Sequence, residues 1–220
     1  VDLEVQCANA IGLWALACTD ARIVNSHQMN QVFLHFGNQT NMAVLNKNEL
    51  SSDYHSYTYM LEKHIVNPGG RSYEGYPDGS VKAELSLASI RTSLAQIYSK
   101  ENTPVLFEAT DGDKSKIDID KISLSVMRGE EPVISLVNGI IEKFAVLVNN
   151  LAYSFFAQRI ILHNLKFTDK QFEYIKKGVA KITGEEIAER LTLSTINDKT
   201  DFIGGCALII QNCFFFRGGI

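Results

Sequence analysis

Cysteine is scarce in this chain of 220 residues and is not arranged to hold a metal or a redox pair. The four cysteines are Cys7, Cys18, Cys206 and Cys213. None belongs to a CxxC pair, and each lies in or beside an apolar run. This pattern is typical of reduced, buried thiols in a cytoplasmic protein and argues against a disulfide framework.

The chain has no excess of positive charge. It carries 21 lysines and arginines against 25 aspartates and glutamates, which gives a formal net charge of −4. Nucleic acids and anionic lipids bind preferentially to basic surfaces. Contact with DNA by this chain alone is therefore not expected.

Long hydrophobic runs are missing as well. The longest, 145–157 and 202–216, are interrupted by amide side chains and fall short of the roughly 20 apolar residues that span a bilayer. Acidic residues stand where the basic flank of a signal peptide would be. We therefore expect no membrane partner.

Because the first residue is Val1 and not Met, we expect a preceding segment.

The remaining composition is that of a folded protein. Hydrophobic residues make up 45% of the chain and charged residues 21%. A chain of this length can bury a sizeable core, as one large domain or two small ones. Neither an internal repeat nor a low-complexity segment is visible.

Apolar periodicity predicts an α/β fold. Alternation at 1–5 and 32–36 indicates half-buried strands, and 42–45 is expected to return from the second of these. The other expected elements are helices at 86–99, 121–128, 131–156 and 169–182, a segment at 185–191 that extends or follows the last of these, strands at 159–162 and 191–196, and a final helix at 202–216. The segment 103–107 is ambiguous. Helices between strands predict a mixed sheet with helices on both faces.

Most of the turn signals fall between residues 46 and 83. They include Asn67-Pro68-Gly69-Gly70 and Pro77-Asp78-Gly79. We predict an irregular insertion here, around a strand at 59–65. Loops of this length are usually functional or disordered.

Three strand-to-helix turns are the expected ligand-binding positions, because ligands bind at the carboxyl ends of strands in such sheets. They are the turns at 6–9, at 37–41 and at His163-Asn164.

The order of motifs along the chain resembles the second lobe of the ROK family, the bacterial sugar kinases and sugar-responsive repressors of the actin-like ATPase superfamily. The residues that carry the resemblance are EVQCANA, QVFLHFGNQTNMAVLNKNEL, LEKHIVNPGG, the long helix within GEEPVISLVNGIIEKFAVLVNNLAYSFFAQRIIL, and DFIGGCALII. The family shows E-N-D-A-N-A, G-T-G-x-G-x-G, E-x-G-H and a cysteine-rich zinc loop in the same order. The resemblance implies a ribonuclease H-like lobe and is strongest for NagC/XylR-like regulators.

The resemblance places Cys7 where family kinases have the aspartate that takes the proton from the sugar hydroxyl. A thiol has a reference pKa near 8.5 and is a poor proton acceptor at neutral pH. Phosphoryl transfer is therefore expected to be lost, so the chain is expected not to be an enzyme. Gln6 keeps an amide that could bind a sugar hydroxyl, while Asn9 is expected to cap the following helix. A plain helix start with a buried thiol is the alternative.

The phosphate loop of the family is also reduced here. Gly37 and Asn38 are its remnant, and Gln39, Asn41 and Ala43 lie where the family has glycines. Glycine lets backbone N–H groups approach phosphates and adopt positive φ. We expect weak or absent ATP binding and an ordinary connection between strands. His163-Asn164 replaces the family's Gly-Gly on the same side.

The zinc loop lacks its thiols. Ser72, Glu74 and Ser80 stand at the cysteine positions, so zinc is not expected. His64 falls on the family's E-x-G-H histidine and is a sugar-contact candidate, although a packed histidine is an equal alternative. The carboxylates of Glu62 and Glu84 lie near the family's acidic positions, out of frame, and are further candidates.

The sequence as a whole is interpreted as residues 1–220 of a carboxyl-terminal ROK lobe, with the preceding lobe and any helix-turn-helix absent. Its expected function is sugar sensing and dimerisation in a transcriptional repressor, without catalysis or cofactors. The expected partners are a small sugar or sugar phosphate, a second copy of the chain, and DNA through the missing domain only. The alternatives are half of an ATP-dependent sugar kinase and a scaffold that binds no sugar.

Overall fold

The computed structural model describes residues 29–36, 40–46, 49–50 and 61–194. These residues belong to two compact units. The second unit consists of Ile65–Leu147 and Lys166–Ala188, and the first contains Val148–Leu165 with the described residues up to His64 and from Glu189 on.

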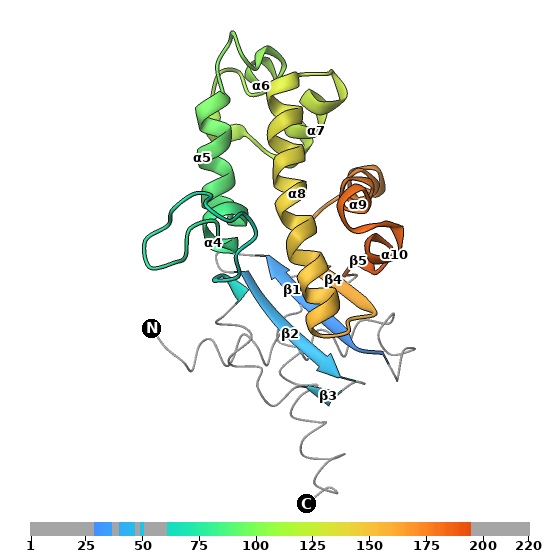
Figure 1. Ribbon diagram of the computed structural model, residues 1–220. Coiled ribbons are helices and arrows are strands. Elements are labelled where there is room, and N and C mark those ends of the chain that lie inside the picture. The colour runs from blue at the N-terminus through green and yellow to red at the C-terminus, as the bar shows by residue number, and fades with distance from the viewer. Residues whose placement is uncertain (1–28, 37–39, 47–48, 51–60, 195–220) are drawn as a thin grey trace, which may run out of the picture. The chain divides into compact units, whose positions relative to one another are not determined.

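A mixed five-stranded sheet forms the described part of the first unit. Its strands are β1 (Gln31–Phe36), β2 (Thr40–Asn46), β3 (Glu49–Leu50), β4 (Arg159–His163) and β5 (Leu191–Leu193). Their order is β3-β2-β1-β4-β5. Strand β2 runs antiparallel to β1 and β3, whereas β4 runs parallel to β1 and β5. The expected mixed sheet is confirmed, and Figure 1 shows β1 and β2 as its antiparallel neighbours.

Strands β1, β2 and β4 are largely buried on both faces, which corrects the expectation that the strand at 32–36 is half-buried. Val32, Phe33 and Leu34 are consecutive in β1 and all 0% exposed. Successive side chains of a strand point to opposite faces, so both faces of β1 are covered. Strand β4 is buried in the same way from Ile160 to His163. Near-continuous burial is typical of parallel strands at the centre of an α/β sheet.

Helices make up most of the second unit. They are α4 (Val81–Leu85), α5 (Leu87–Ile97), α6 (Pro104–Ala109), the 3-10 turn η1 (Lys114–Lys116), α7 (Ile119–Met127), α9 (Asp169–Thr183) and α10 (Glu185–Ala188). The long helix α8 (Glu131–Ser154) contributes its residues up to Leu147 to this unit and the rest to the first.

A small apolar core joins α5, α6 and α8 in the second unit. It consists of Leu94, Tyr98, Leu106 and Val133, which are at most 6% exposed. The buried hydroxyl of Tyr98 is hydrogen-bonded to the hydroxyl of Thr110, which satisfies the polar end of a side chain that is otherwise packed. Helices α5 and α8 therefore run side by side in Figure 1 because their apolar faces share this core.

Side-chain caps define where the helices begin. Thr168 caps helix α9: its hydroxyl accepts the N–H of Gln171, and the Gln171 side chain accepts the N–H of Thr168. This reciprocal pair is a capping box. Helix α6 begins at Pro104 and resolves the ambiguous segment 103–107. Two of its first N–H groups, from Val105 and Leu106, donate to the buried carboxylate of Glu130.

Two expectations for the segment 46–83 need correction. No strand forms over the described part of 59–65, because residues 61–63 make a turn and His64 donates its N–H to the carbonyl of Leu61. Ile65 makes only an isolated bridge to Ser80. Helix α4 was not expected and begins at Val81, where Ser80 is its N-cap. The strand expected at 1–5 and the helix expected at 202–216 lie outside the described residues.

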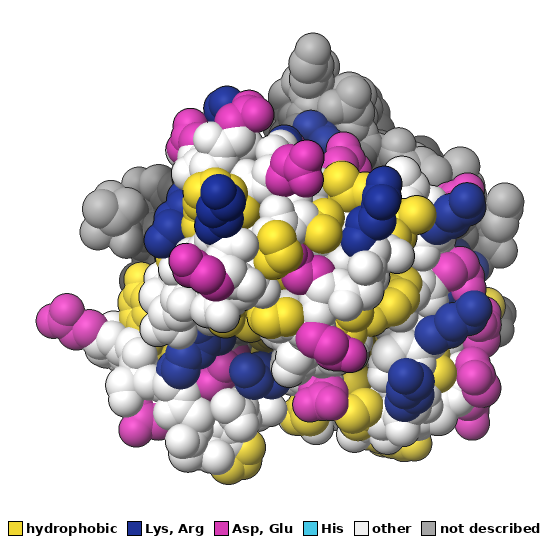
Figure 2. Space-filling model, turned by 90° about the horizontal axis from the view of Figure 1, so that it is seen from above, with side chains coloured by type: hydrophobic (Ala, Val, Ile, Leu, Met, Phe, Trp, Pro, Cys, Tyr) yellow, Lys and Arg dark blue, Asp and Glu magenta, His cyan; other side chains and the backbone are white. Residues whose placement is uncertain are grey.

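Charge is mixed over the face drawn in Figure 2, where basic and acidic side chains alternate with small apolar areas. This is typical of a solvated surface. Within the described ranges, none of the helices is both long and apolar enough to span a bilayer.

The carboxylate of Glu130 is predicted to stabilise helix α6. It is 7% exposed and occupies the helix N-terminus, where N–H groups lack partners within the helix. The substitution Glu130→Ala is expected to lower the free energy of unfolding by about 1–2 kcal/mol. Urea unfolding measures this, with Glu173→Ala on the exposed face of α9 as the control, expected to change it by less than about 0.5 kcal/mol. Equal effects of the two substitutions would contradict the capping role.

Candidate functional site

The segment between residues 66 and 80 forms a closed loop in the second unit. The N–H groups of Val66 and Asn67 both donate to the carbonyl of Gly79, at 2.9 and 3.0 Å, and the N–H of Gly79 donates to the carbonyl of Arg71 at 2.8 Å. Gly79 has φ +70°, and a Cβ atom there would lie 1.6 Å from the carbonyl oxygen of Asn67. The loop therefore closes only because this position is glycine.

Aromatic and cationic side chains occupy the tip of this loop. The rings of Tyr73 and Tyr76 meet edge to face with centroids 5.6 Å apart, and the Lys82 ammonium lies 5.8 and 5.7 Å from them. This arrangement is a cation–π cluster.

The residues of the loop do not fit zinc. Ser80, at one of the expected cysteine positions, is buried, and its hydroxyl accepts the N–H of Ala83 at the start of α4. Within the described residues there is also no group of three or more histidine, cysteine, aspartate or glutamate side chains that could hold a metal ion. The loop is held by its own hydrogen bonds and by one buried carboxylate.

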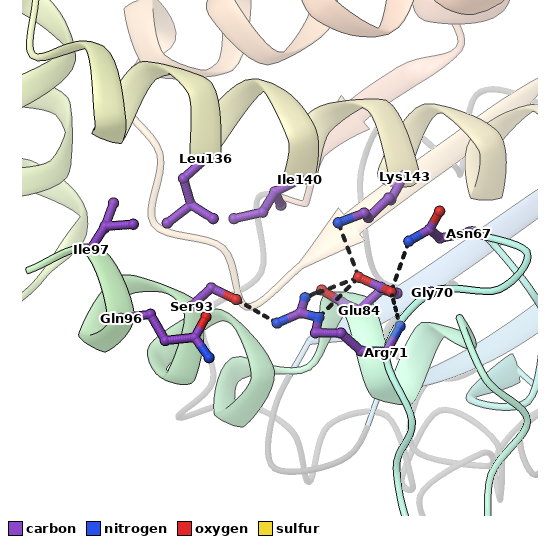
Figure 3. A pocket seen from close by; sticks show the side chains of 10 residues that line it. All are labelled: Asn67, Gly70, Arg71, Glu84, Ser93, Gln96, Ile97, Leu136, Ile140 and Lys143. Atoms are coloured by element: carbon purple, nitrogen blue, oxygen red, sulfur yellow. Dashed lines mark hydrogen bonds and ion pairs between the residues drawn. The ribbon is translucent and has the colours of Figure 1, made fainter.

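That carboxylate belongs to Glu84 on α4, whose side chain is 1% exposed. Its Oε1 accepts the Asn67 side-chain amide at 2.9 Å and the backbone N–H of Arg71 at 2.8 Å. Its Oε2 accepts the Arg71 guanidinium at 3.0 and 3.1 Å and lies 3.0 Å from the Lys143 ammonium on α8. Figure 3 shows these groups converging on the carboxylate. We call these four residues the Glu84 network.

The guanidinium of Arg71 has no donor left for a ligand. Beyond its bonds to the Glu84 carboxylate, it donates to the carbonyl of Ser89 at 3.0 Å, to the hydroxyl of Ser93 and to the carbonyl of Glu84 at 3.1 Å. A guanidinium has five N–H groups, and all are used here. Arg71 therefore connects the loop, α4 and α5 as a structural residue.

The pKa of Glu84 shows which effect dominates in this network. Burial raises the pKa, but the hydrogen bonds from the Arg71 backbone, Asn67, Lys143 and the Arg71 side chain outweigh burial and lower it to about 2. The carboxylate is therefore ionised at neutral pH, and the cations around it remain paired.

An open groove of about 430 Å³ lies above the network, between α5 and α8 (Figure 3). Lys143 and Arg71 line one end of it, and Ile97, Leu136 and Ile140 line the other. All of its lining residues belong to the second unit. A volume of this size falls within the range of small-molecule sites.

The sugar-contact candidates are distributed over both units. Glu84 lies at the floor of the groove. Glu62 lies in the first unit, is 7% exposed, and its Oε1 accepts the N–H of Thr40 at the start of β2, at 3.0 Å. His64 lies in the first unit too, is half-buried, and burial lowers its pKa, so it is neutral at pH 7. The structure gives Glu62 and Glu84 structural bonds, and their contact with sugar remains a prediction.

The remaining candidates cannot be placed. Gln6 and Cys7 of the first turn, and Gly37 and Asn38 of the phosphate-loop remnant, lie outside the described residues. Sequence analysis missed Asn67, Arg71 and Lys143. The sequence feature that could have indicated these partners was Glu84 itself, because a carboxylate on the buried face of a helix requires cationic partners.

The carboxyl ends of the parallel strands β1 and β4 are joined by Asn164. It has φ +64°, the left-handed conformation that favours glycine, and its side-chain amide donates to the carbonyl of Phe36 at 2.6 Å. Glycine is what the family resemblance implies at this position. His163 is 0% exposed and packs against Phe33 and His35, with ring centroids 5.3 and 5.4 Å away.

No family model matches the chain, and its sequence matches no curated protein. Solved structures do match its fold. One is the ROK family glucokinase from Streptomyces griseus in complex with glucose and AMPPNP, with 14% identity, a TM-score of 0.65 and coverage of 91% of this chain and 66% of that one. Another is a ROK family transcriptional regulator, a homologue of the E. coli MLC protein, with 15% identity, a TM-score of 0.69 and coverage of 92% and 50%. A third is the ROK hexokinase from Thermus thermophilus, with 11% identity, a TM-score of 0.66 and coverage of 91% and 62%.

These comparisons define the class of fold. The chain shares the mixed α/β fold of these ROK family kinases and regulator, which confirms the expected α/β class with a mixed sheet. It spans half to just under two thirds of the length of these structures. Kinases and a regulator match it about equally well, so the fold does not distinguish a kinase from a transcriptional regulator.

The Glu84 network makes the free energy of unfolding depend on pH in the acid range. Because the pKa of the Glu84 carboxyl is about 2 in the folded chain and its ordinary value is 4.5, its contribution to stability is complete above about pH 4.5 and is lost as the pH falls through about 2. A difference of this size corresponds to roughly 3 kcal/mol. Urea unfolding at pH 7, 5 and 3 should show this loss in the native protein.

The substitution Glu84→Gln should lower stability at pH 7 and flatten its change between pH 5 and pH 3. Glu74→Gln, on the exposed part of the same loop, is the matched control and should retain the native pH profile. A Glu84→Gln protein that loses stability in acid as steeply as the native chain would contradict the assignment.

Substituting two glycines of the loop distinguishes the energetic cost of a steric clash from that of backbone strain alone. Gly75 and Gly79 both have positive φ, but a Cβ atom at Gly75 would meet nothing within 4 Å. Gly75→Ala is expected to cost about 1 kcal/mol of unfolding free energy, and Gly79→Ala about 3 kcal/mol or more, because it also breaks the loop closure. Thermal and urea unfolding of the pair would measure the difference. Equal costs would show that the loop can open around the new methyl group.

Proposed function

We propose that this chain is the second lobe of a ROK-type protein that senses a small sugar or sugar phosphate, dimerises, and does not catalyse phosphoryl transfer. The proposal rests on the fold together with the identity of one residue, Cys7. The fold matches ROK proteins over about nine tenths of the chain, whereas Cys7 stands where the resemblance implies the catalytic carboxylate. A thiol with an ordinary pKa does not serve as the general base.

The nucleotide side of the lobe supports the same proposal. Nucleotide phosphates need bare backbone N–H groups at a glycine-rich turn. Here the neighbouring position after β4 holds Asn164, whose side-chain amide is bonded to the carbonyl of Phe36 at the end of β1. ATP is accordingly not part of the proposed function. Zinc is not either, because Ser80 at a cysteine position caps helix α4.

A sensor requires less of its site than a kinase does. It needs only a difference in effector affinity between two conformations. In this proposal the chain acts in the cytoplasm as part of a transcriptional repressor. DNA binding belongs to a helix-turn-helix encoded before Val1, and a second copy of the chain completes the dimer.

Two other functions follow from particular observations. The glucokinase match, whose structure holds glucose and AMPPNP, favours the carboxyl-terminal half of a sugar kinase. The replacement of zinc ligands in the loop favours a degenerate scaffold, since repressors of the family commonly keep that loop. The upstream coding sequence separates the first two, because a helix-turn-helix indicates a repressor and a D-x-G-x-T phosphate motif indicates a kinase.

A panel of sugars and sugar phosphates tests the proposal on the longest product of the gene. At a hundredfold excess over Kd, the effector is expected to raise the melting temperature by about 5–10 °C, without sugar-dependent ATP hydrolysis. L-Glucose is the control for D-glucose. Sugar-dependent hydrolysis of ATP would establish the kinase alternative, and no response to any sugar would establish the scaffold.

A further inference from the structure

The groove between α5 and α8 has two chemically different ends. Lys143 projects from α8 at one end, and the aliphatic side chains of Ile97, Leu136 and Ile140 project into the other (Figure 3). Such a groove suits a molecule that is itself polar at one end and apolar at the other.

The polar end carries a net positive charge. Two cations, Arg71 and Lys143, face the single carboxylate of Glu84. Arg71 has no N–H group left. Lys143 uses one of its three N–H groups on Glu84, and its other two have no partner among the residues that the structure describes. Its side chain is 26% exposed, so a ligand can reach these donors.

A second donor lies along the same groove. Gln96 is exposed on α5 and lines it. Its amide can donate one hydrogen bond and accept another. In Figure 3 Gln96 lies beside Ile97 and Ser93, away from Lys143, so Lys143 is the donor left to meet the anionic group of a ligand.

The apolar end excludes most polar ligands. A free sugar would place hydroxyl groups against Ile97, Leu136 and Ile140, where they would lose water without gaining partners. A hydrocarbon body would bury its surface there at a gain.

We propose that this groove binds a small amphipathic carboxylate, with its carboxylate on Lys143 and its hydrocarbon body on Ile97, Leu136 and Ile140. The site lies wholly in the second unit and does not depend on the sugar-sensing role proposed above.

Calorimetric titration of the full 220-residue chain with three probes of equal length tests both halves of the proposal. Octanoate is expected to bind at least tenfold more tightly than octanol, and octylammonium more weakly than octanol. Equal affinities for the three would overturn the role of charge. Acetate, a shorter control that has the carboxylate without the hydrocarbon body, should bind much more weakly, and acetate binding as tightly as octanoate would overturn the role of the aliphatic end.

Variants and methyl NMR locate the site. Lys143→Gln is expected to weaken octanoate binding at least tenfold, Lys143→Arg to restore most of it, and Lys177→Gln on the exposed face of α9 to leave it unchanged. If Lys143→Gln fails to fold, methyl NMR of the native protein tests the location of the site. Octanoate should then shift the methyl signals of Ile97, Leu136 and Ile140, and shifts confined to other methyl groups would overturn the assignment.

Discussion

The ionised carboxylate of Glu84 is the constraint on which the second unit depends. A buried charge is tolerated only when hydrogen bonds and opposite charges compensate its lost hydration. Here the loop supplies Asn67 and Arg71, and α8 supplies Lys143. These bonds connect the loop to helices α4, α5 and α8. Removing the cations would leave the carboxylate buried without ionic partners.

This network also shows which groups hold the loop in place. A zinc site gains stability by joining distant thiolates through one ion. The present loop joins its ends through the carbonyl of Gly79 and one carboxylate instead. The same network leaves Lys143 with donors that face an open groove, so a structural solution creates a surface with ligand-binding chemistry. Lys143 thus has both a structural role and the proposed binding role.

Local sequence patterns were reliable where one periodicity extended over many residues. The long helix α8 and strand β4 lie where the pattern placed them. The strand expected at 59–65 does not form over residues 61–65, where a turn and an isolated bridge at Ile65 take its place. Half-burial of β1 was wrong because alternation in one strand does not report what covers its second face. Periodicity predicted an α/β fold with a mixed sheet, the family resemblance predicted a ROK-type lobe, and the structural matches bear out the fold.

The order of strands and helices and the replacement of Asp by Cys7 can be read from the chain alone, because both are properties of neighbouring residues or of a resemblance in their order. Only the tertiary structure decided that Glu84, Arg71 and Lys143 meet, and that Asn164 joins two strand ends. These partners are far apart in the chain, and many pairings of charges are compatible with the same sequence. Packing brings one set together, and the loss of water there makes their pairing obligatory.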